Sequence, residues 1–360
     1  MKEESVFETI VCPTGEGNPR NSEASVGELR DGRLLLAYTD CYGTAEDEGA
    51  ARISGKLSSD RGRTWSEKFT IQDNVGQQNV MCATLLRLRS GEMAFFYLQK
   101  NSAGDLKAYV KRSFDEGQTW SEAVCVTPKP GYHVMNNDRV IQLSSGRLLA
   151  PVAHTPDCWV EVPNEGAPPG LEVYEIEGRR VLGNHMRAWC YLSDDNGRTW
   201  KMGEGQVDLP SIGVQEPGLV ELKDGRVLMI MRTKLGCIYK AHSDDGGSTW
   251  SGARPTNLIA PVSPCTIKRI PTTGDLLMIW NHTRSAVRSP LTTAFSRDEG
   301  ETWENIKDLE PRSDKMSYGY PSALFVGKEA VLTYYSGVEE GTAGLWSLKL
   351  KIVPMTWFYA

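Results

Sequence analysis

The chain has 360 residues, and its 40 Lys and Arg against 46 Asp and Glu give a formal net charge of −6. A hydrophobic share of 40% is ordinary for a folded globular chain and excludes intrinsic disorder. The acidic balance, without a run of Lys and Arg, excludes the basic surface that binding to nucleic acid requires. This length fits either two domains or one large all-β unit.

The N-terminal segment and the cysteines bear on localisation and on metal binding. Residues 1–17 contain no apolar core of signal-peptide length, and no stretch approaches eighteen apolar residues. We therefore expect a cytoplasmic protein without a membrane partner, with a mature exported form as the alternative. The eight cysteines are scattered and form no CxxC motif, so we expect buried thiols, no metal site and no cofactor.

Pairs of apolar runs recur along the chain, and each pair surrounds a short polar turn such as Asp-Gly or Ser-Gly. This pattern predicts β-hairpins. The six predicted hairpins span residues 28–38, 86–98, 141–153, 220–231, 267–280 and 324–335.

An octet of the form S-x-D-x-G-x-T-W follows five of these hairpins. It occupies residues 58–65, 113–120, 193–200, 243–250 and 296–303, with starts 55, 80, 50 and 53 residues apart. Periods near fifty residues indicate one supersecondary unit repeated in a ring or a solenoid. The hairpins between the octets exclude helical repeats.

Two hairpins per repeat, one closed by the Asp-Gly type of turn and one by the octet, predict a four-stranded antiparallel blade. Six such blades form a six-bladed β-propeller, which hides most strand edges without helices. We therefore expect an all-β fold with residues 1–360 as a single domain. The last repeat lacks an octet, so residues 5–12 are expected to pair beside residues 344–353 and close the ring.

The octets themselves are predicted to be folding devices rather than a catalytic signature. In a tight turn the Asp accepts backbone N–H groups, the Gly permits a positive φ and the Trp packs between sheets. The turns that carry them join the third and fourth strands and share a face with the Asp-Gly turns. The octet aspartates are therefore not catalytic candidates: Asp60, Asp115, Asp195, Asp245 and Asp298.

Functional residues are expected on the opposite face of the blades. The segments that lead into each first strand, and those that join second and third strands, meet there. They are rich in polar and charged residues, which are costly to bury near an axis unless they are paired or face a ligand. Capping of a strand end is the alternative role for each. The candidates are Arg20, Glu23, Asn79, His133, Asn137, Asp138, Arg139, Gln215, Tyr318 and an insertion from His154 to His185 with Trp159.

The octets and several of these segments resemble the sialidases (neuraminidases), a superfamily of six-bladed propellers with Asp-box repeats. Residues 215–233 look like the segment with the Glu that partners the nucleophile and a substrate-binding Arg, and residues 281–303 like one with a second Arg. Residues 319–325 resemble the strand with the Tyr nucleophile, and residues 46–60 the loop with the acid/base Asp. The resemblance implies Glu216, Arg232, Arg288 (or Arg284), Tyr320 (or Tyr318) and Asp47 in these roles.

The first-strand arginine departs from the family pattern. Sialidases have Arg-Ile-Pro before the first strand, whereas this chain has Arg20 about two residues further from the Asp-Gly turn. Either Arg20 still reaches the axis, or Glu23 takes its place and puts an acid where a carboxylate clamp is expected.

The residue types suit cleavage of a sugar whose anomeric carbon bears a carboxylate. Arginine binds a carboxylate bidentately and keeps its charge. A neutral tyrosine activated by a glutamate attacks such a centre better than a carboxylate, and double displacement gives retention. We expect Asp47 to have a raised pKa, to protonate the leaving oxygen and then to deprotonate water.

The resemblance thus predicts an exo-acting, retaining sialidase or a hydrolase of a related acidic sugar, with a glycan or oligosaccharide as its partner. Two other classes stay open because a fold does not dictate a function. One is a propeller enzyme for another sugar, either a glycosidase or a lyase of uronic acids that uses His133 or Tyr320. The other is a noncatalytic carbohydrate-binding propeller.

Overall fold

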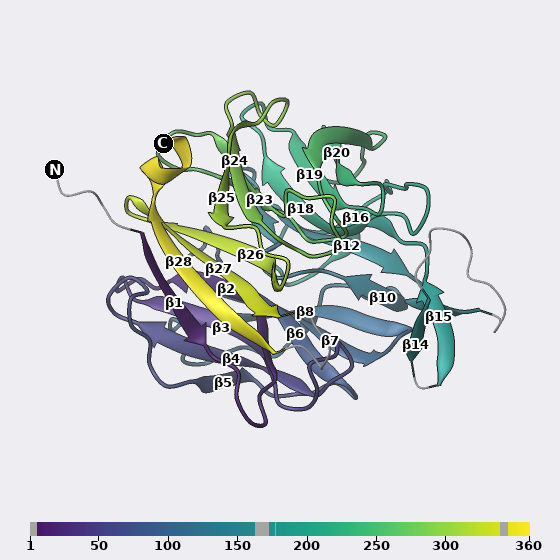
Figure 1. The fold of residues 1–360 in the computed structure, drawn as a ribbon, viewed down its shortest axis with the longest axis horizontal. Coiled ribbons are helices and arrows are strands. Elements are labelled where there is room, and N and C mark those ends of the chain that lie inside the picture. Colours follow the sequence, from purple (N-terminus) through teal and green to yellow (C-terminus); the bar gives the residue numbers. More distant parts are fainter. Residues whose placement is uncertain (1–5, 163–172, 177, 339–344) are drawn as a thin grey trace.

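The computed structural model describes residues 6–162, 173–176, 178–338 and 345–360. Across these ranges the regular elements are β-strands, apart from the short 3-10 helix η1 (Met355–Tyr359). The predicted all-β class is therefore confirmed. Figure 1 shows the strand groups arranged around the middle of the molecule, with β2, β6, β18 and β26 among the strands closest to it.

Strands that follow one another in sequence pair antiparallel into successive groups. The first group contains β2 (Arg20–Glu28), β3 (Leu34–Cys41), β4 (Ala51–Ser58) and β5 (Phe69–Gln72). The second group contains β6 (Asn79–Arg87), β7 (Met93–Ser102), β8 (Asp105–Ser113) and β9 (Val124–Cys125). The next contains β10 (Gly131–Val134), β11 (Ile141–Gln142), β12 (Leu148–Thr155), β16 (Arg187–Ser193) and β17 (Lys201–Met202). The fourth group contains β18 (Gln215–Glu221), β19 (Val227–Arg232), β20 (Cys237–Ser243) and β21 (Arg254–Ile259). The fifth group contains β22 (Thr266–Arg269), β23 (Leu276–Trp280), β24 (Leu291–Ser296) and β25 (Glu304–Glu310).

The last group unites the two ends of the chain. It consists of β26 (Met316–Val326), β27 (Glu329–Val338), β28 (Trp346–Pro354) and the N-terminal β1 (Phe7–Cys12). β1 pairs antiparallel with β28, so Phe7 lies opposite Ile352, and the purple and yellow strands run side by side in Figure 1. The expected pairing of the chain ends is present. The described sheets do not close on themselves, so a closed ring of six blades stays a prediction.

The insertion after β12 forms a small sheet of its own. It contains β13 (Trp159–Glu161), β14 (Tyr174–Ile176) and β15 (Arg179–Gly183), with β15 in the middle. Its residues 163–172 and 177 lie outside the described part of the chain.

Four of the innermost strands contain a β-bulge at which one non-glycine residue adopts a left-handed backbone. These residues are Glu23 in β2 (φ 44°), Cys82 in β6 (φ 62°), Glu216 in β18 (φ 47°) and Tyr320 in β26 (φ 54°). Each lies where the pairing register with the next strand shifts. A bulge turns a side chain away from the ordinary alternation of a strand. Three of these four residues are candidates from the sequence.

The octets join the third and fourth strands and have the expected local role. In all five, the Asp accepts hydrogen bonds from the Thr amide at 2.8–2.9 Å and from the Thr hydroxyl at 2.6 Å. The octets also contact the hairpin turns of neighbouring repeats, as where the Arg30 amide donates to Glu116 at 2.8 Å. These hydrogen bonds explain the presence of an Asp in each octet by its role in the turn, without a role in ligand binding.

Replacing Asp245 by Ala is expected to lower the free energy of unfolding by about 1–2 kcal/mol, because the turn loses its charged acceptor. Asp244→Ala is the matched control, since this exposed neighbour is not an acceptor within the octet. Urea unfolding at neutral pH compares the two. Burial alone would raise the pKa of Asp245, but the hydrogen bonds from Thr249 and Ser243 lower this pKa below its usual value. The difference should therefore shrink as the pH falls into the acid range. Equal stabilities at neutral pH would contradict the structural role.

Candidate active site

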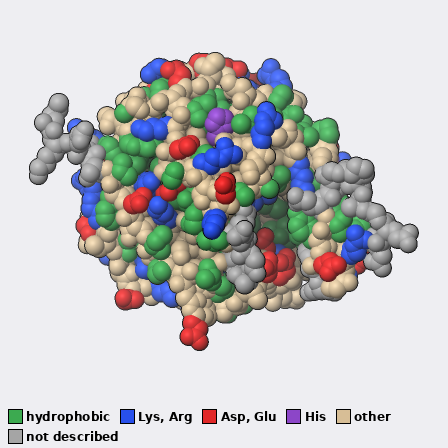
Figure 2. Space-filling model, in the orientation of Figure 1, with side chains coloured by type: hydrophobic (Ala, Val, Ile, Leu, Met, Phe, Trp, Pro, Cys, Tyr) green, Lys and Arg blue, Asp and Glu red, His purple; other side chains and the backbone are tan. Residues whose placement is uncertain are grey.

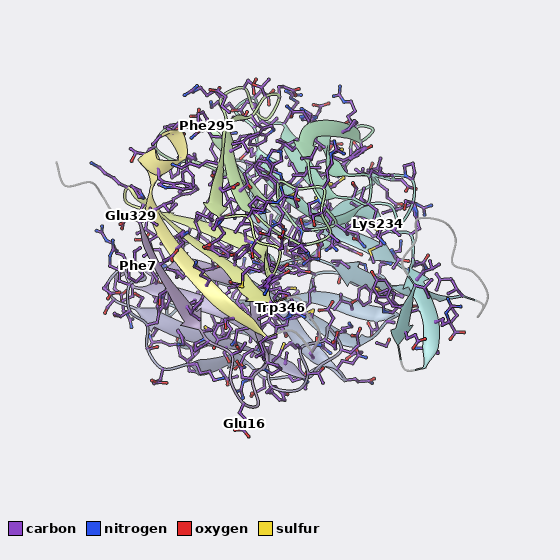
Figure 3. The ribbon with its side chains drawn as sticks, in the orientation of Figure 1. Phe7, Glu16, Lys234, Phe295, Glu329 and Trp346 are labelled. Carbon is purple, nitrogen blue, oxygen red and sulfur yellow. The ribbon has the colours of Figure 1, made fainter. Side chains whose placement is uncertain are left out.

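A cavity of about 960 Å³ opens where the inner strand ends meet the loop between β3 and β4. Figure 2 shows this face hollowed near its middle, with acidic side chains in the hollow. Figure 3 places Trp346, at the start of β28, near the middle of the same view. The side chains that line the cavity include Arg20, Glu46, Asp47, Glu48, Trp159, Tyr174, Glu175, Arg288, Tyr320, Tyr335 and Trp346.

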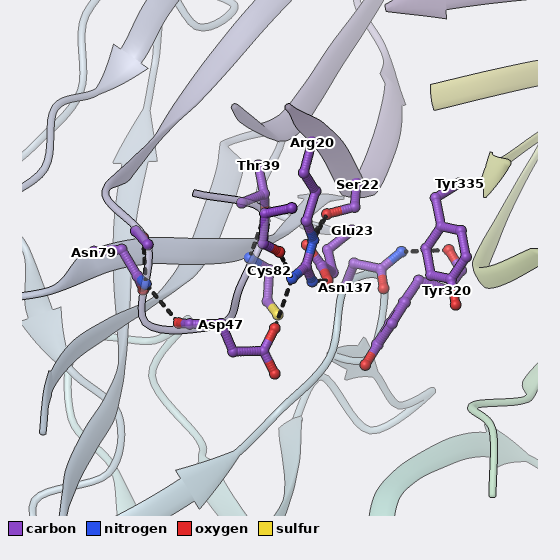
Figure 4. A network of polar contacts seen from close by, with 12 residues as sticks. Arg20, Ser22, Glu23, Thr39, Asp47, Asn79, Cys82, Asn137, Tyr320 and Tyr335 are labelled. Carbon is purple, nitrogen blue, oxygen red and sulfur yellow. Dashed lines mark hydrogen bonds and ion pairs between the residues drawn. The ribbon is translucent and has the colours of Figure 1, made fainter. Parts of the chain in front are cut away.

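Arg20 begins β2 and is held by the protein on several sides (Figure 4). Its Nη1 donates to Asp47 Oδ1 at 2.6 Å and to the Ala45 carbonyl at 3.1 Å, while Nε donates to Ser22 at 2.8 Å. Its Nη2 donates to the carboxylate of Glu23, which is 2% exposed. Arg20 therefore reaches the site despite its displaced position. Four of its five N–H groups already have protein acceptors.

Asp47 is a carboxylate in this arrangement, which corrects the expectation of a raised pKa. Burial would raise its pKa, but Arg20, Lys100 and Arg288 lower the pKa of Asp47 to about 2. Although Asp47 lies in the wall of the cavity, its side chain is 62% exposed. The physical reason is the pairing with Arg20, which stabilises the ionised form.

The loop that carries Asp47 is fixed from β6 and β7. Asn79, at the start of β6, donates its amide to the carbonyls of Asp47 at 2.8 Å and of Gly49 at 2.9 Å. Lys100 on β7 donates to the Asp47 carbonyl at 3.2 Å and to Glu48 at 3.0 Å. Asn79 thus positions the loop rather than facing the cavity.

Tyr320 lines the cavity and contacts Glu216, which is 5% exposed and is not among the lining residues. The Tyr320 hydroxyl donates to Glu216 Oε1 at 3.2 Å, and Arg232 Nη1 donates to Glu216 Oε2 at 2.5 Å. Burial would raise the pKa of Glu216, but Arg232 holds it below its usual value. Burial and Glu216 together raise the pKa of Tyr320. The pair is therefore a neutral phenol that donates to an ionised acceptor.

Arg288 lies over the ring of Tyr320, with its guanidinium carbon 5.7 Å from the ring centroid. It donates to the Tyr335 hydroxyl at 2.7 Å and to the Val262 carbonyl at 3.3 Å. Arg284, the alternative from the sequence, is exposed and does not line the cavity. The site thus combines Tyr320, Asp47, Arg20 and Arg288, which line the cavity, with Glu216 and Arg232, which are connected to Tyr320 by hydrogen bonds.

Two candidates from the sequence lie in the core instead of the cavity. Tyr318 is 5% exposed and its ring packs 6.2 Å from that of Tyr334. His133 is fully buried and packs against His154 and Trp189, and burial lowers its pKa to about 3. Neither residue lines the cavity.

The other polar candidates lie beneath or beside the site. Gln215 pairs with Arg232 in the register of β18 and β19. Asn137, Asp138 and Arg139 form hydrogen bonds with residues around the bulge of β26 and with the strands beside it.

Sequence reasoning missed several residues of the cavity wall. Tyr335 lies opposite Gly319 in the register of β26 and β27, and Trp346 begins the next strand. The signal for Tyr335 was its pairing with the segment that bears the expected nucleophile. Tyr174 and Glu175 come from the insertion, whose fold the sequence pattern did not indicate.

Within the described ranges, no group of three or more His, Cys, Asp or Glu side chains is placed to hold a metal ion. No helix among those residues is long and apolar enough to cross a membrane.

A family model described as the BNR repeat-like domain matches residues 32–331. The chain therefore belongs to this family, within the sialidase superfamily with BNR (Asp-box) repeats. A sialidase of Micromonospora viridifaciens is 27% identical over 360 residues, which cover 88% of this chain and 50% of that protein. A sialidase of Paraclostridium sordellii is 28% identical over 254 residues, which cover 63% of this chain and 56% of that protein. The chain spans about half the length of the curated relatives it matches.

Solved structures of low sequence identity share the fold. A Trypanosoma rangeli sialidase in complex with the inhibitor DANA superposes with a TM-score of 0.71 at 17% identity, covering 96% of this chain and 59% of that one. A protein of unknown function from Dyadobacter fermentans superposes with a TM-score of 0.72 at 19% identity, covering 98% of this chain and 99% of that one. The all-β fold is thus sialidase-like.

Lys100→Met is expected to raise the pKa of Asp47, because it removes one of the cations that hold this carboxylate ionised. The variant keeps the length of the buried side chain. The pKa is measured from the ¹³C NMR titration of the Asp47 carboxyl, assigned with Asp47→Asn. Lys107→Met is the control, since Lys107 faces Asp105 on β8. A pKa of Asp47 that is the same in both variants would contradict the role of Lys100.

Proposed function

We propose that this chain is a retaining glycoside hydrolase that releases a terminal sialic acid, or a related acidic sugar, from a glycan. The observation that carries the proposal is the hydrogen bond to Glu216 from the hydroxyl of Tyr320, which lines the cavity together with Asp47 and Arg288. Relatives called sialidases, at 25–28% identity, support a glycosidase.

In the first step the Tyr320 oxygen forms a bond to the anomeric carbon, and its proton passes to the ionised Glu216. Asp47 protonates the leaving oxygen as the glycosidic bond breaks. In the second step Asp47 takes a proton from water, the water oxygen attacks the anomeric carbon, the bond to Tyr320 breaks and the Tyr320 oxygen takes its proton back from Glu216. Two displacements at one carbon retain its configuration.

Asp47 needs a proton for the first step, although Arg20 keeps it ionised in this arrangement. A substrate carboxylate that settles among the arginines adds a negative charge beside Asp47. That charge competes for Arg20 and raises the pKa of Asp47, because like charges disfavour ionisation. Binding of an acidic sugar would thus prepare the acid that cleaves it.

We assign the binding of the substrate carboxylate to Arg288 and Arg20, which line the cavity, and to Arg232, which contacts Glu216. The pairing of Arg20 with Glu23 and Asp47 favours a second candidate, because it leaves this arginine little capacity for a bidentate contact. That candidate is a propeller glycosidase for another sugar. We also propose that the strand groups are six blades around one axis, closed by the pairing of β1 with β28.

Tyr320→Phe is expected to lower kcat for a fluorogenic aryl sialoside by roughly 1,000-fold or more, because the attacking oxygen is lost. Tyr318→Phe is the matched control, since that ring packs in the core. Circular dichroism shows whether each variant is folded. Full activity of Tyr320→Phe would remove this residue from the mechanism.

A panel of acidic glycosides tests the substrate class. Free sialic acid as the product supports the proposal, and proton NMR of the first-formed anomer reports retention. Release of another sugar, with no turnover of sialosides, would favour the second candidate. An unsaturated product that absorbs in the ultraviolet would identify a lyase, and binding without turnover a noncatalytic protein.

The insertion is expected to contact the leaving group. Trp159 and Tyr174 line the cavity with their ring centroids 5.5 Å apart, on strands β13 and β14. Trp159→Ala should raise KM for sialyllactose about tenfold, because a sugar ring loses its aromatic contact. KM for a methyl sialoside, which has no second ring, should not change. Phe114→Ala is the control, since Phe114 is 66% exposed on an octet turn. Equal effects of Trp159→Ala on both substrates would contradict a leaving-group contact.

A further inference from the structure

The backbone of Tyr320 needs external support. Its φ of 54° lies in the left-handed region, which a non-glycine residue occupies stably only where its surroundings hold it. The bulge between Gly319 and Ser322 also interrupts the pairing of β26 with β27, so two residues lack their partners in that ladder. Some other part of the molecule must supply the missing contacts.

Asn137 supplies one of them from a segment 183 positions away in the sequence. Its side-chain amide donates to the Tyr320 carbonyl at 3.1 Å and to the Ala24 carbonyl at 2.7 Å. Figure 4 shows Asn137 between Glu23 and Tyr320. Asn137 is fully buried, and its one amide group joins the bulge of β2 to the bulge of β26.

The next two residues contact the same bulge. Asp138 accepts a hydrogen bond from the Ala323 amide at 3.2 Å, and Lys268 holds its other oxygen at 2.7 Å. Arg139 Nη1 donates to the Thr266 hydroxyl at 3.0 Å, which in turn donates to the Pro321 carbonyl at 2.6 Å. Contacts therefore reach residues 320, 321 and 323 of β26.

The segment is itself anchored on β6. The Asp138 amide donates to the Ala83 carbonyl, and the Arg139 amide donates to the Thr84 hydroxyl, both at 3.3 Å. Arg139 is 2% exposed, and a guanidinium is costly to bury without a compensating interaction. Arg139 also helps to hold the pKa of Glu216 below its usual value. Arg139 thus contacts the bulge that holds Tyr320, through Thr266, and also stabilises the ionised form of Glu216.

We propose that Asn137, Asp138 and Arg139 form a brace that fixes the bulge of β26 and so aims the Tyr320 hydroxyl at Glu216. They are positioning residues for the nucleophile and do not touch the substrate. The proposal rests on the proposed catalytic role of Tyr320. It gives a function to residues that the family resemblance leaves without one.

Asn137→Ala tests the brace, with Asn136→Ala as the matched control. Asn136 is the adjacent asparagine, is 2% exposed, and its side-chain nitrogen has no hydrogen-bond partner among the described residues. Asn137→Ala should lower kcat for an aryl sialoside by about 100-fold with KM unchanged, because the nucleophile is misaligned while the arginines are intact. Asn136→Ala should keep the kcat of the unmodified protein. Equal losses in both variants, or an unchanged kcat in Asn137→Ala, would overturn the proposal.

Thr266→Val gives a second test should Asn137→Ala fail to fold. It keeps the side-chain shape and removes only the hydroxyl that links Arg139 to Pro321, so kcat should again fall while KM holds. A fully active Thr266→Val would count against the brace.

A crystal structure of Asn137→Ala separates the brace from the proposed function. The brace predicts that Tyr320 leaves the left-handed region and that its hydroxyl moves away from Glu216, whether or not the protein cleaves sialosides. An unmoved Tyr320 would refute the brace. Inactivity of the unmodified protein on sialosides would instead refute the proposed function.

Discussion

The candidate site depends on left-handed residues within the innermost strands. In a regular strand, side chains alternate between the two faces, and both faces of a central strand here pack against neighbouring sheets. A single residue of positive φ breaks that alternation and changes the direction of its own side chain. Glu23, Glu216 and Tyr320 all gain their orientation in this way. None is glycine, so the surrounding hydrogen bonds must offset an unfavourable backbone.

The same region concentrates charged side chains, and several of them form ion pairs. Arg20 contacts Glu23 and Asp47, and Arg232 contacts Glu216. Pairs of this kind seldom add stability over apolar packing, but removal of one member leaves a costly unpaired charge. A ligand with a carboxylate therefore enters a set of existing ion pairs and must exchange partners with them. In the proposed function, recognition of such a ligand and the protonation state of Asp47 are coupled for that reason.

Local patterns predicted the strand groups, the octet turns and the pairing of the chain ends, because each depends on short-range turn chemistry or on alternation. The residues of the site were predicted less evenly. Alternation places Tyr318 and Tyr320 on one face of β26, and only the bulge between Gly319 and Ser322 separates them. That bulge is held by Asn137 and Thr266, which are distant in sequence. The pairing of Asp47 with Arg20, the burial of His133 and the aromatic wall of the insertion likewise arise from long-range packing.

The pairing of β1 with β28 affects how the chain can assemble during synthesis. β1 emerges first, yet its partner strand follows more than three hundred residues later. Until β28 is made, β1 lacks its partner strand, although β26 with Tyr320 has already been made. Loop closure over so many residues is a slow step. The strands within each of the other groups lie close together in sequence, whereas the group that contains Tyr320 is completed only when β28 joins the two ends of the chain.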